Sequence, residues 1–196
     1  MKRTIMDRIY ELSSKLSISS FNSSGSGGEI KFAIFDYEPQ DELRIRKEID
    51  KISRNNKTIK VFDLYNMMIE VIKDESYFDN IIEMETEFPK DVMLSQVFQP
   101  LLALEQEDNP IISKFKERVA DDGKSIVLII GVGKAYPIIR SHTVLNNLHS
   151  VFRNNPVVML YPGTYEHETL RLFDKLDDDN YYRAFNLVKR SKWKWK

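Results

Sequence analysis

The chain contains no cysteine among its 196 residues. It therefore forms no disulfide, no thiolate zinc site and no cysteine nucleophile, a composition typical of a reducing compartment. With only three histidines, any metal site would depend mainly on oxygen ligands. A surplus of one charge is also missing, because 29 lysines and arginines nearly cancel 30 aspartates and glutamates. Contact with nucleic acid or an anionic membrane would thus have to be local.

Long apolar runs are absent as well. No segment approaches the roughly 20 apolar residues that a helix needs to cross a bilayer. The first residues carry charge at Lys2 and Arg3 and do not have the pattern of a signal peptide. We therefore expect a soluble, cytoplasmic protein without membrane contact. The length suits one domain, which we place at 1–188, followed by a basic tail at 189–196.

Short apolar runs alternate with helical patterns along the chain. Strands are predicted at 30–35, 58–63, 125–130 and 156–161, with an edge strand at 181–187. Helices are predicted at 4–16, 41–52, 64–72, 93–104, 111–119 and 137–152. This alternation predicts an α/β domain in which helices cover both faces of a parallel sheet, giving three layers, α/β/α.

Two segments depart from the alternation. Residues 76–119 have no strand pattern, so we expect a helical insertion between the second and third strands. Residues 19–28 are rich in serine and glycine, which predicts a flexible loop. The whole resembles a P-loop nucleoside triphosphatase core without a functional phosphate loop.

A glycine-rich turn at 131–134 follows a strand and precedes a helix, the position of a phosphate-binding loop. The Walker pattern needs glycine where Leu128 stands and a hydroxyl side chain where Ala135 stands. A dinucleotide fingerprint fails as well, because Tyr136 occupies the place of its third glycine. We favour a tight strand-to-helix turn, with loose phosphate contact through Lys134 as the alternative.

Other polar groups could carry chemistry. Asp36 and Asp63 each end a predicted strand, where paired carboxylates could hold magnesium or act as a base. Solvated or helix-capping acids are the simpler interpretation. His142, Asn146 and His149 share one helix face, but their spacing is not that of a zinc protease, which favours polar packing. We therefore predict no catalytic residue, metal site or cofactor.

The tail at 189–196 interleaves basic residues with Trp193 and Trp195. Such a segment could stack on nucleobases or lie at a membrane surface. It leaves a DNA-binding accessory role open as an alternative.

Seven ordered motifs run through the chain. They are Phe35-Asp36-Tyr37-x-Pro39, Gly131-Val132-Gly133-x-Ala135-Tyr136-Pro137, Arg140-x-His142, Leu145-Asn146-Asn147-Leu148, Tyr161-Pro162-Gly163-x-Tyr165, Leu170-Arg171-Leu172-Phe173 and Asp179-Asn180-Tyr181-Tyr182-Arg183-Ala184-Phe185. Together they resemble the BrxB family, small components of BREX bacteriophage-defence systems, over nearly the whole chain.

The resemblance implies a cytoplasmic protein encoded beside a methyltransferase, a large ATPase and a PglZ-type protein. It implies a non-catalytic scaffold or adaptor that associates with other BREX proteins, the PglZ-type protein first among them, and only indirectly with DNA. The oligomeric state stays open. A degenerate nucleotide binder or magnesium-dependent enzyme using Lys134, Asp36 and Asp63 is the alternative.

The motif loops supply the aromatic and arginine side chains that interfaces favour. The predicted partner-binding residues are Tyr136, Arg140, Tyr161, Tyr165, Arg171 and Arg183. The competing interpretation is that these residues only hold the loops together.

Overall fold

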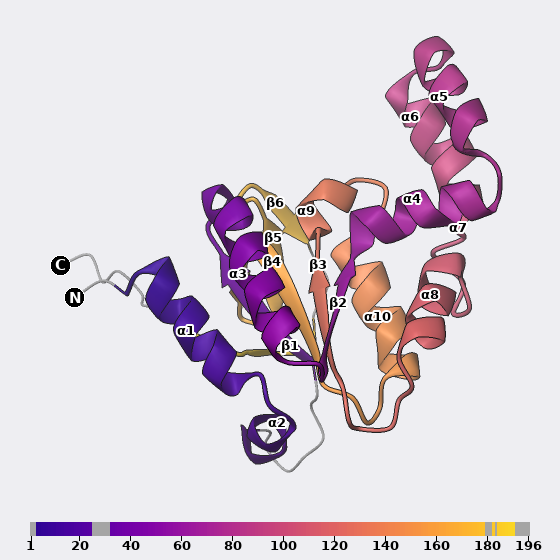
Figure 1. Ribbon diagram of the computed structural model, residues 1–196. Coiled ribbons are helices and arrows are strands. Elements are labelled where there is room, and N and C mark those ends of the chain that lie inside the picture. The colour runs from indigo at the N-terminus through magenta and orange to yellow at the C-terminus, as the bar shows by residue number, and fades with distance from the viewer. Residues whose placement is uncertain (1–2, 25–31, 179–181, 183, 191–196) are drawn as a thin grey trace.

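A parallel sheet forms the centre of the structure (Figure 1). The computed structural model describes residues 3–24, 32–178, 182 and 184–190. The parallel strands lie in the order β2-β3-β4-β1-β7. Their bounds are β1 (Phe32–Tyr37), β2 (Ile59–Asp63), β3 (Ile126–Ile130), β4 (Val157–Glu166) and β7 (Phe185–Asn186). The strands predicted from apolar runs are thereby confirmed. The edge strand is much shorter than predicted, and residues 181 and 183 of it lie outside the described ranges.

The expectation of a purely parallel sheet was wrong. β4 continues to Glu166 and pairs antiparallel with β5 (Thr169–Leu172), which pairs with β6 (Leu176–Asp178). The turn between β4 and β5 places His167 and Glu168 at φ of +51° and +63°. Such hairpin turns usually carry glycine or asparagine at these positions, so the sequence lacked the usual signal. The sheet is therefore mixed, with a hairpin extending from one end of β4.

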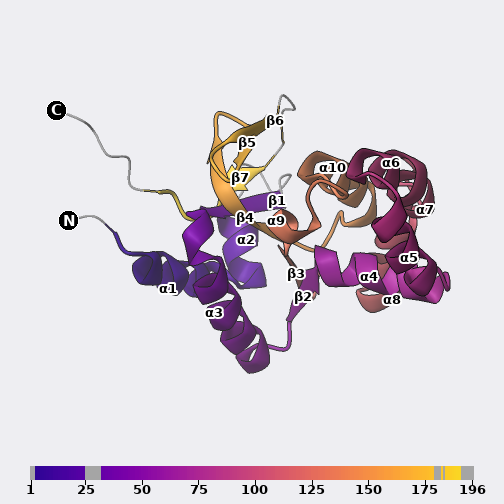
Figure 2. The same cartoon turned by 90° about the horizontal axis from the view of Figure 1, so that it is seen from above.

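Two apolar cores cover the two faces of the sheet. Successive residues of β1 alternate between them, so Phe32 and Ile34 face one core and Ala33 and Phe35 the other. One core packs against α1 (Ile5–Lys15) and α3 (Glu42–Asn55), and the other against α4 (Leu64–Asp74), α8 (Pro110–Arg118) and α10 (Ser141–Val151). Figure 2 shows these helix groups on opposite sides of the strands. Helices thus cover both faces of the sheet, as predicted.

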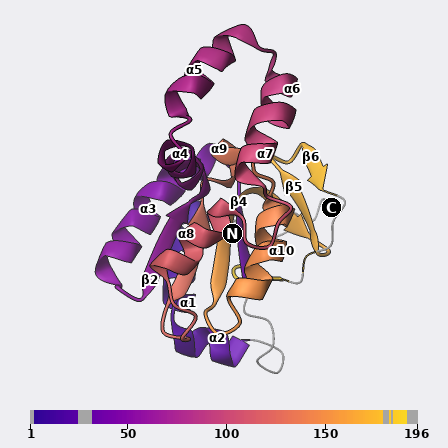
Figure 3. The ribbon, with the colours of Figure 1, turned by 90° about the vertical axis from the view of Figure 1, so that its right-hand side faces the viewer.

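The helical insertion between β2 and β3 is confirmed in the described chain. After α4 it contains α5 (Phe78–Glu87), α6 (Lys90–Val92), the π-helix η3 (Met93–Phe98), α7 (Gln99–Leu102) and α8. Asn109 caps α8 by accepting the Ile112 N–H at 3.0 Å, just before Pro110. The helices α5 and α6 stand away from the sheet as an arm (Figure 3).

Two local expectations need correction. Residues 18–24 form helix α2 (Ile18–Ser24), where Ser17 Oγ accepts the Ser20 N–H, so part of the predicted loop is helical. Residues 25–28 of that loop lie outside the described ranges. The helix predicted at 137–152 begins only at Ser141. Helical backbone is disfavoured for a residue before a proline, so Tyr136 is extended and α9 (Val132–Ala135) ends there. No helix in the described ranges is long and apolar enough to cross a membrane.

A buried ion cluster ties α1 and residues 188–190 to the sheet. Asp36 of β1, 2% exposed, accepts a hydrogen bond from Arg8 of α1 at 2.9 Å, and Arg190 lies 3.4 Å away. Arg8 also donates to the Val188 carbonyl at 2.9 Å. Burial lowers the pKa of Arg8, an effect that the Asp36 charge opposes. Asp36 is therefore a structural anchor inside the protein.

Replacing this anchor should destabilise the fold strongly. We expect Asp36→Ala to lower the free energy of unfolding by about 3–5 kcal/mol, because it leaves the buried Arg8 guanidinium uncompensated. Chemical denaturation measures the loss. The control is Glu38→Ala, which removes an exposed carboxylate 3.7 Å from Arg190 and should cost below about 1 kcal/mol. Equal losses in the two variants would contradict the anchoring role.

Candidate docking surface at the strand ends

Asp63, the last residue of β2, is the centre of a charge network at the carboxyl ends of the strands. Its Oδ1 accepts the backbone N–H groups of Tyr65 and Asn66 at 3.1 and 3.2 Å and so caps α4. Its Oδ2 accepts a hydrogen bond from Arg46 at 2.7 Å and lies 3.2 Å from the Lys134 ammonium. Both carboxylate oxygens are engaged inside the protein, so the capping interpretation of Asp63 is confirmed.

The network balances its own charges. Burial alone would raise the pKa of Asp63, but the hydrogen bonds from Arg46 and the Asn66 amide, with the charges of Arg46 and Lys134, hold that pKa below its ordinary value of 3.8. Arg46 also donates to Glu42 at 2.6 Å. Since two carboxylates face two cations, the network has no surplus positive charge to offer a phosphate.

Gly131 is required at the end of β3 by the same carboxylate. Its φ is +78°, in the left-handed region that favours glycine, and a Cβ there would lie 2.4 Å from Asp63 Oδ1. The short helix α9 (Val132–Ala135) begins directly after it. Packing against Asp63 therefore explains this glycine, and the tight strand-to-helix turn is confirmed.

Asp36 and Asp63 do not form a carboxylate pair. The sheet order puts β4 and β3 between their strands, a separation of roughly 14 Å at the usual strand spacing. Each acid binds its own arginine, Arg8 or Arg46. Across the described ranges, no group of three or more histidine, aspartate or glutamate side chains is placed to hold a metal ion.

The polar stripe on α10 also has a packing role. The His149 ring lies against Phe32 of β1, with ring centroids 3.7 Å apart. His142 is half-buried and Asn146 is exposed. His149 is otherwise exposed, so the ring contact shows packing on the sheet for this one residue, and packing of the stripe against neighbouring loops stays a prediction.

The predicted partner-binding residues divide by exposure. Tyr136 and Arg140 are exposed in the loop between α9 and α10, and Arg171 is exposed on β5, where its Nε lies 3.0 Å from Asp177. Tyr161 and Tyr165, by contrast, are only 1% and 5% exposed. Arg183 lies outside the described residues. The surface that a partner could touch is thus the exposed subset.

Tyr165, one of the two buried tyrosines, holds neighbouring segments together. The Tyr165 hydroxyl donates to the Ala184 carbonyl at 2.7 Å, and its backbone N–H donates to Asp36 at 3.3 Å. Burial raises the pKa of Tyr165 to about 12. The extended end of β4 is thereby fixed to β1 and to the segment that precedes β7.

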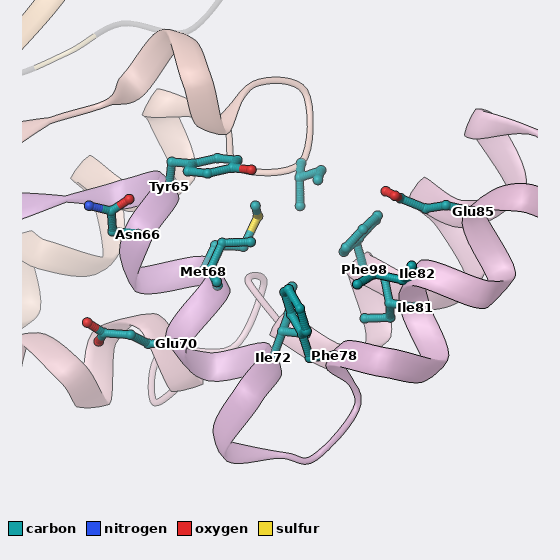
Figure 4. A pocket seen from close by; sticks show the side chains of 12 residues that line it. Tyr65, Asn66, Met68, Glu70, Ile72, Phe78, Ile81, Ile82, Glu85 and Phe98 are labelled. Atoms are coloured by element: carbon teal, nitrogen blue, oxygen red, sulfur yellow. The ribbon is translucent and has the colours of Figure 1, made fainter.

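A groove adjoins this surface and was not predicted from the sequence. It has a volume of about 650 Å³ and lies between α4 and α5, and Phe98 of η3 and Ile138 of the 136–140 loop also line it (Figure 4). Its walls are mainly apolar, and the side chains of Met68, Phe78 and Ile82 point into it. The apolar residues of 78–82 at helical spacing were the available signal, but spacing does not show which apolar face stays uncovered.

Comparison with known proteins is informative at the family level. The BrxB family model, described as BREX protein BrxB, matches residues 60–187. A BREX protein BrxB of Bacillus cereus (strain H3081.97) is 40% identical over 192 residues, covering 95% of this chain and 98% of the relative. The chain belongs to the BrxB family. It is thus a component of a BREX anti-phage defence system.

A second BrxB relative supports the same assignment. A BREX protein BrxB of Escherichia coli O9:H4 (strain HS) is 30% identical over 185 residues, covering 92% of this chain and 90% of the relative. No solved structure matches the chain. The assignment therefore rests on sequence similarity over nearly the whole length of both relatives.

Several BrxB motifs converge on one another in space. A Cβ at Gly133 would lie 2.7 Å from the Phe173 ring, so the glycine lets that ring pack on the turn after β3. The Phe173 N–H donates to the Pro162 carbonyl at 2.8 Å. Three motifs, from the turn after β3, from β4 and from β5, therefore meet at one end of the sheet.

The Asp63 contact gives Gly131 a measurable role. We expect Gly131→Ala to cost at least about 2 kcal/mol of folding free energy, because the new Cβ is strained at positive φ and displaces the Asp63 carboxylate. Gly123→Ala is the matched control. Its φ is +74°, but its Cβ would meet no atom closer than 3.8 Å, so only the backbone strain of about 1 kcal/mol applies. Equal losses would exclude the close contact.

The lowered pKa of Asp63 predicts an acid-dependent stability. Its stabilising effect is fully present above the ordinary value of 3.8 and is lost as the pH falls through the lower pKa of the folded state. We expect Asp63→Asn to remove this part of the pH dependence, which falls below the ordinary value of 3.8. Denaturation curves at a series of pH values measure it. Parallel profiles for wild type and variant would contradict the network.

Proposed function

We propose that this chain is a non-catalytic adaptor that binds another BREX component. The contact would lie on the exposed loops at the carboxyl ends of the strands, and the first candidate for the partner is a PglZ-type protein. The exposed side chains Tyr136, Arg140 and Arg171 would make the contact. Aromatic and arginine side chains are enriched in protein interfaces, where they often contribute most of the binding energy.

This proposal depends on one observation. The charged groups that were candidates for catalysis or ligand binding form ion pairs within the protein. Asp36 is bound by Arg8 and Arg190, and Asp63 by Arg46 and Lys134. These groups stabilise the edge and leave its exposed loops for recognition. That division of roles favours a docking surface over an active site.

A likeness to a nucleoside triphosphatase core, expected from the sequence, would fit the same proposal. In the usual strand order of such a core, the phosphate loop would follow the first strand. Here β1 runs into Glu38 and the 3-10 turn η2 (Pro39–Asp41), a connection without glycine. We infer that the connection after β1 has a structural role and does not form a phosphate-binding loop.

Co-purification with the other BREX proteins tests the adaptor role. We expect the wild-type chain to capture the PglZ-type protein. The Arg140→Glu/Arg171→Glu double variant should bind it about tenfold or more weakly, because both charges are reversed at the centre of the contact.

The control variant is Arg54→Glu, which reverses an exposed charge on α3, away from this surface. It should bind as the wild type does. Failure of the wild-type chain to capture any BREX protein would end the adaptor proposal, whereas unchanged binding of the double variant would move the contact to another surface.

A further inference from the structure

The groove between α4 and α5 is an apolar site on an acidic arm. Ile82 on its wall is 49% exposed, and Phe88 just beyond α5 is 44% exposed. Helix α5 carries four carboxylates, Asp79, Glu83, Glu85 and Glu87, and no basic residue. Within the ranges that the structure describes, none of the four pairs with a cation.

These properties define the chemistry of an occupant. Apolar walls favour large apolar or aromatic anchors, which lose water on entering the groove. The uncompensated carboxylates favour positive charge beside those anchors. The groove therefore suits a short basic segment with aromatic side chains.

The carboxyl-terminal tail of the chain has this composition. Residues 189–196 contain five basic residues, no acidic residue, and the tryptophans Trp193 and Trp195. If the tail binds in an extended form, Trp193 and Trp195 would face one side and Lys192, Lys194 and Lys196 the other, because side chains two residues apart share a side. A tail bound in this form would place two aromatic anchors in the groove and its lysines toward the carboxylates of α5.

The point of departure of the tail favours a second copy as host. The structure describes the chain as far as Arg190, which is held 3.4 Å from Asp36 on β1. The strand order puts two strands between β1 and β2, and α4 with the arm lies beyond β2, on the side away from α1 (Figure 1). The six residues after Arg190 extend over roughly 20 Å at most.

We propose that the Trp/Lys tail of one copy binds in the groove between α4 and α5 of a second copy. The contact is heterologous, because tail and groove are different surfaces. It gives a dimer when two copies exchange tails and a longer chain when they do not. This proposal is independent of the adaptor role, because it needs no other BREX protein.

Sedimentation velocity over a range of protein concentrations tests self-association. We expect the wild-type chain to associate as its concentration rises, and more weakly at high salt. Deletion of residues 191–196 or the Trp193→Ala/Trp195→Ala variant should weaken association about tenfold or more. Ile82→Arg should do the same, because it removes an apolar wall and repels the lysines.

Two further samples separate this contact from a general loss of folding or charge. Leu43→Arg makes a similar change at an 81% exposed position on α3 and should associate as the wild type does. A mixture of Ile82→Arg, which keeps its tail, with the tail deletion, which keeps its groove, should regain association. A monomeric wild type, undiminished association of the deletion, or no recovery in the mixture would overturn the proposal.

Discussion

The buried carboxylate of Asp36 is the interaction on which the arrangement of this fold depends. It lies on a central strand and binds Arg8 from the first helix and Arg190 from the last described residues, and it accepts the Tyr165 N–H from β4. A charge in such a place is tolerated only when it is paired and hydrogen-bonded. Helix α1 and the last described residues, 188–190, are thereby tied to the sheet.

Ion pairs within the protein also occupy the strand-end edge at the end of β2. Asp63 caps α4, binds Arg46 and Lys134, and fixes the identity of Gly131 through a close approach. In α/β proteins this edge of the sheet often binds ligands, but here its charged groups form ion pairs with one another. What stays exposed is a set of aromatic and arginine side chains beside an apolar groove, a composition suited to recognition of other proteins.

Much of the fold was predictable because its signals are local. Apolar runs marked the parallel strands, and apolar residues at helical spacing marked the helices that cover them. The β4–β5 hairpin was missed because His167 and Glu168, which form its turn, adopt positive φ without the usual glycine or asparagine. Among the predicted partner-binding residues, Tyr161 and Tyr165 are buried. No local pattern indicates this, because both faces of the strand are covered here.

The sequence by itself determined the α/β alternation, the helical insertion, the failure of the glycine turn as a phosphate loop and the family motifs, since each depends on neighbouring residues. Only the tertiary structure decided the strand order, the partners of Asp36 and Asp63, and the uncovered groove. The physical reason is range. Arg8 meets a carboxylate 28 residues away and a carbonyl 180 residues away, and such contacts follow from packing of the whole chain.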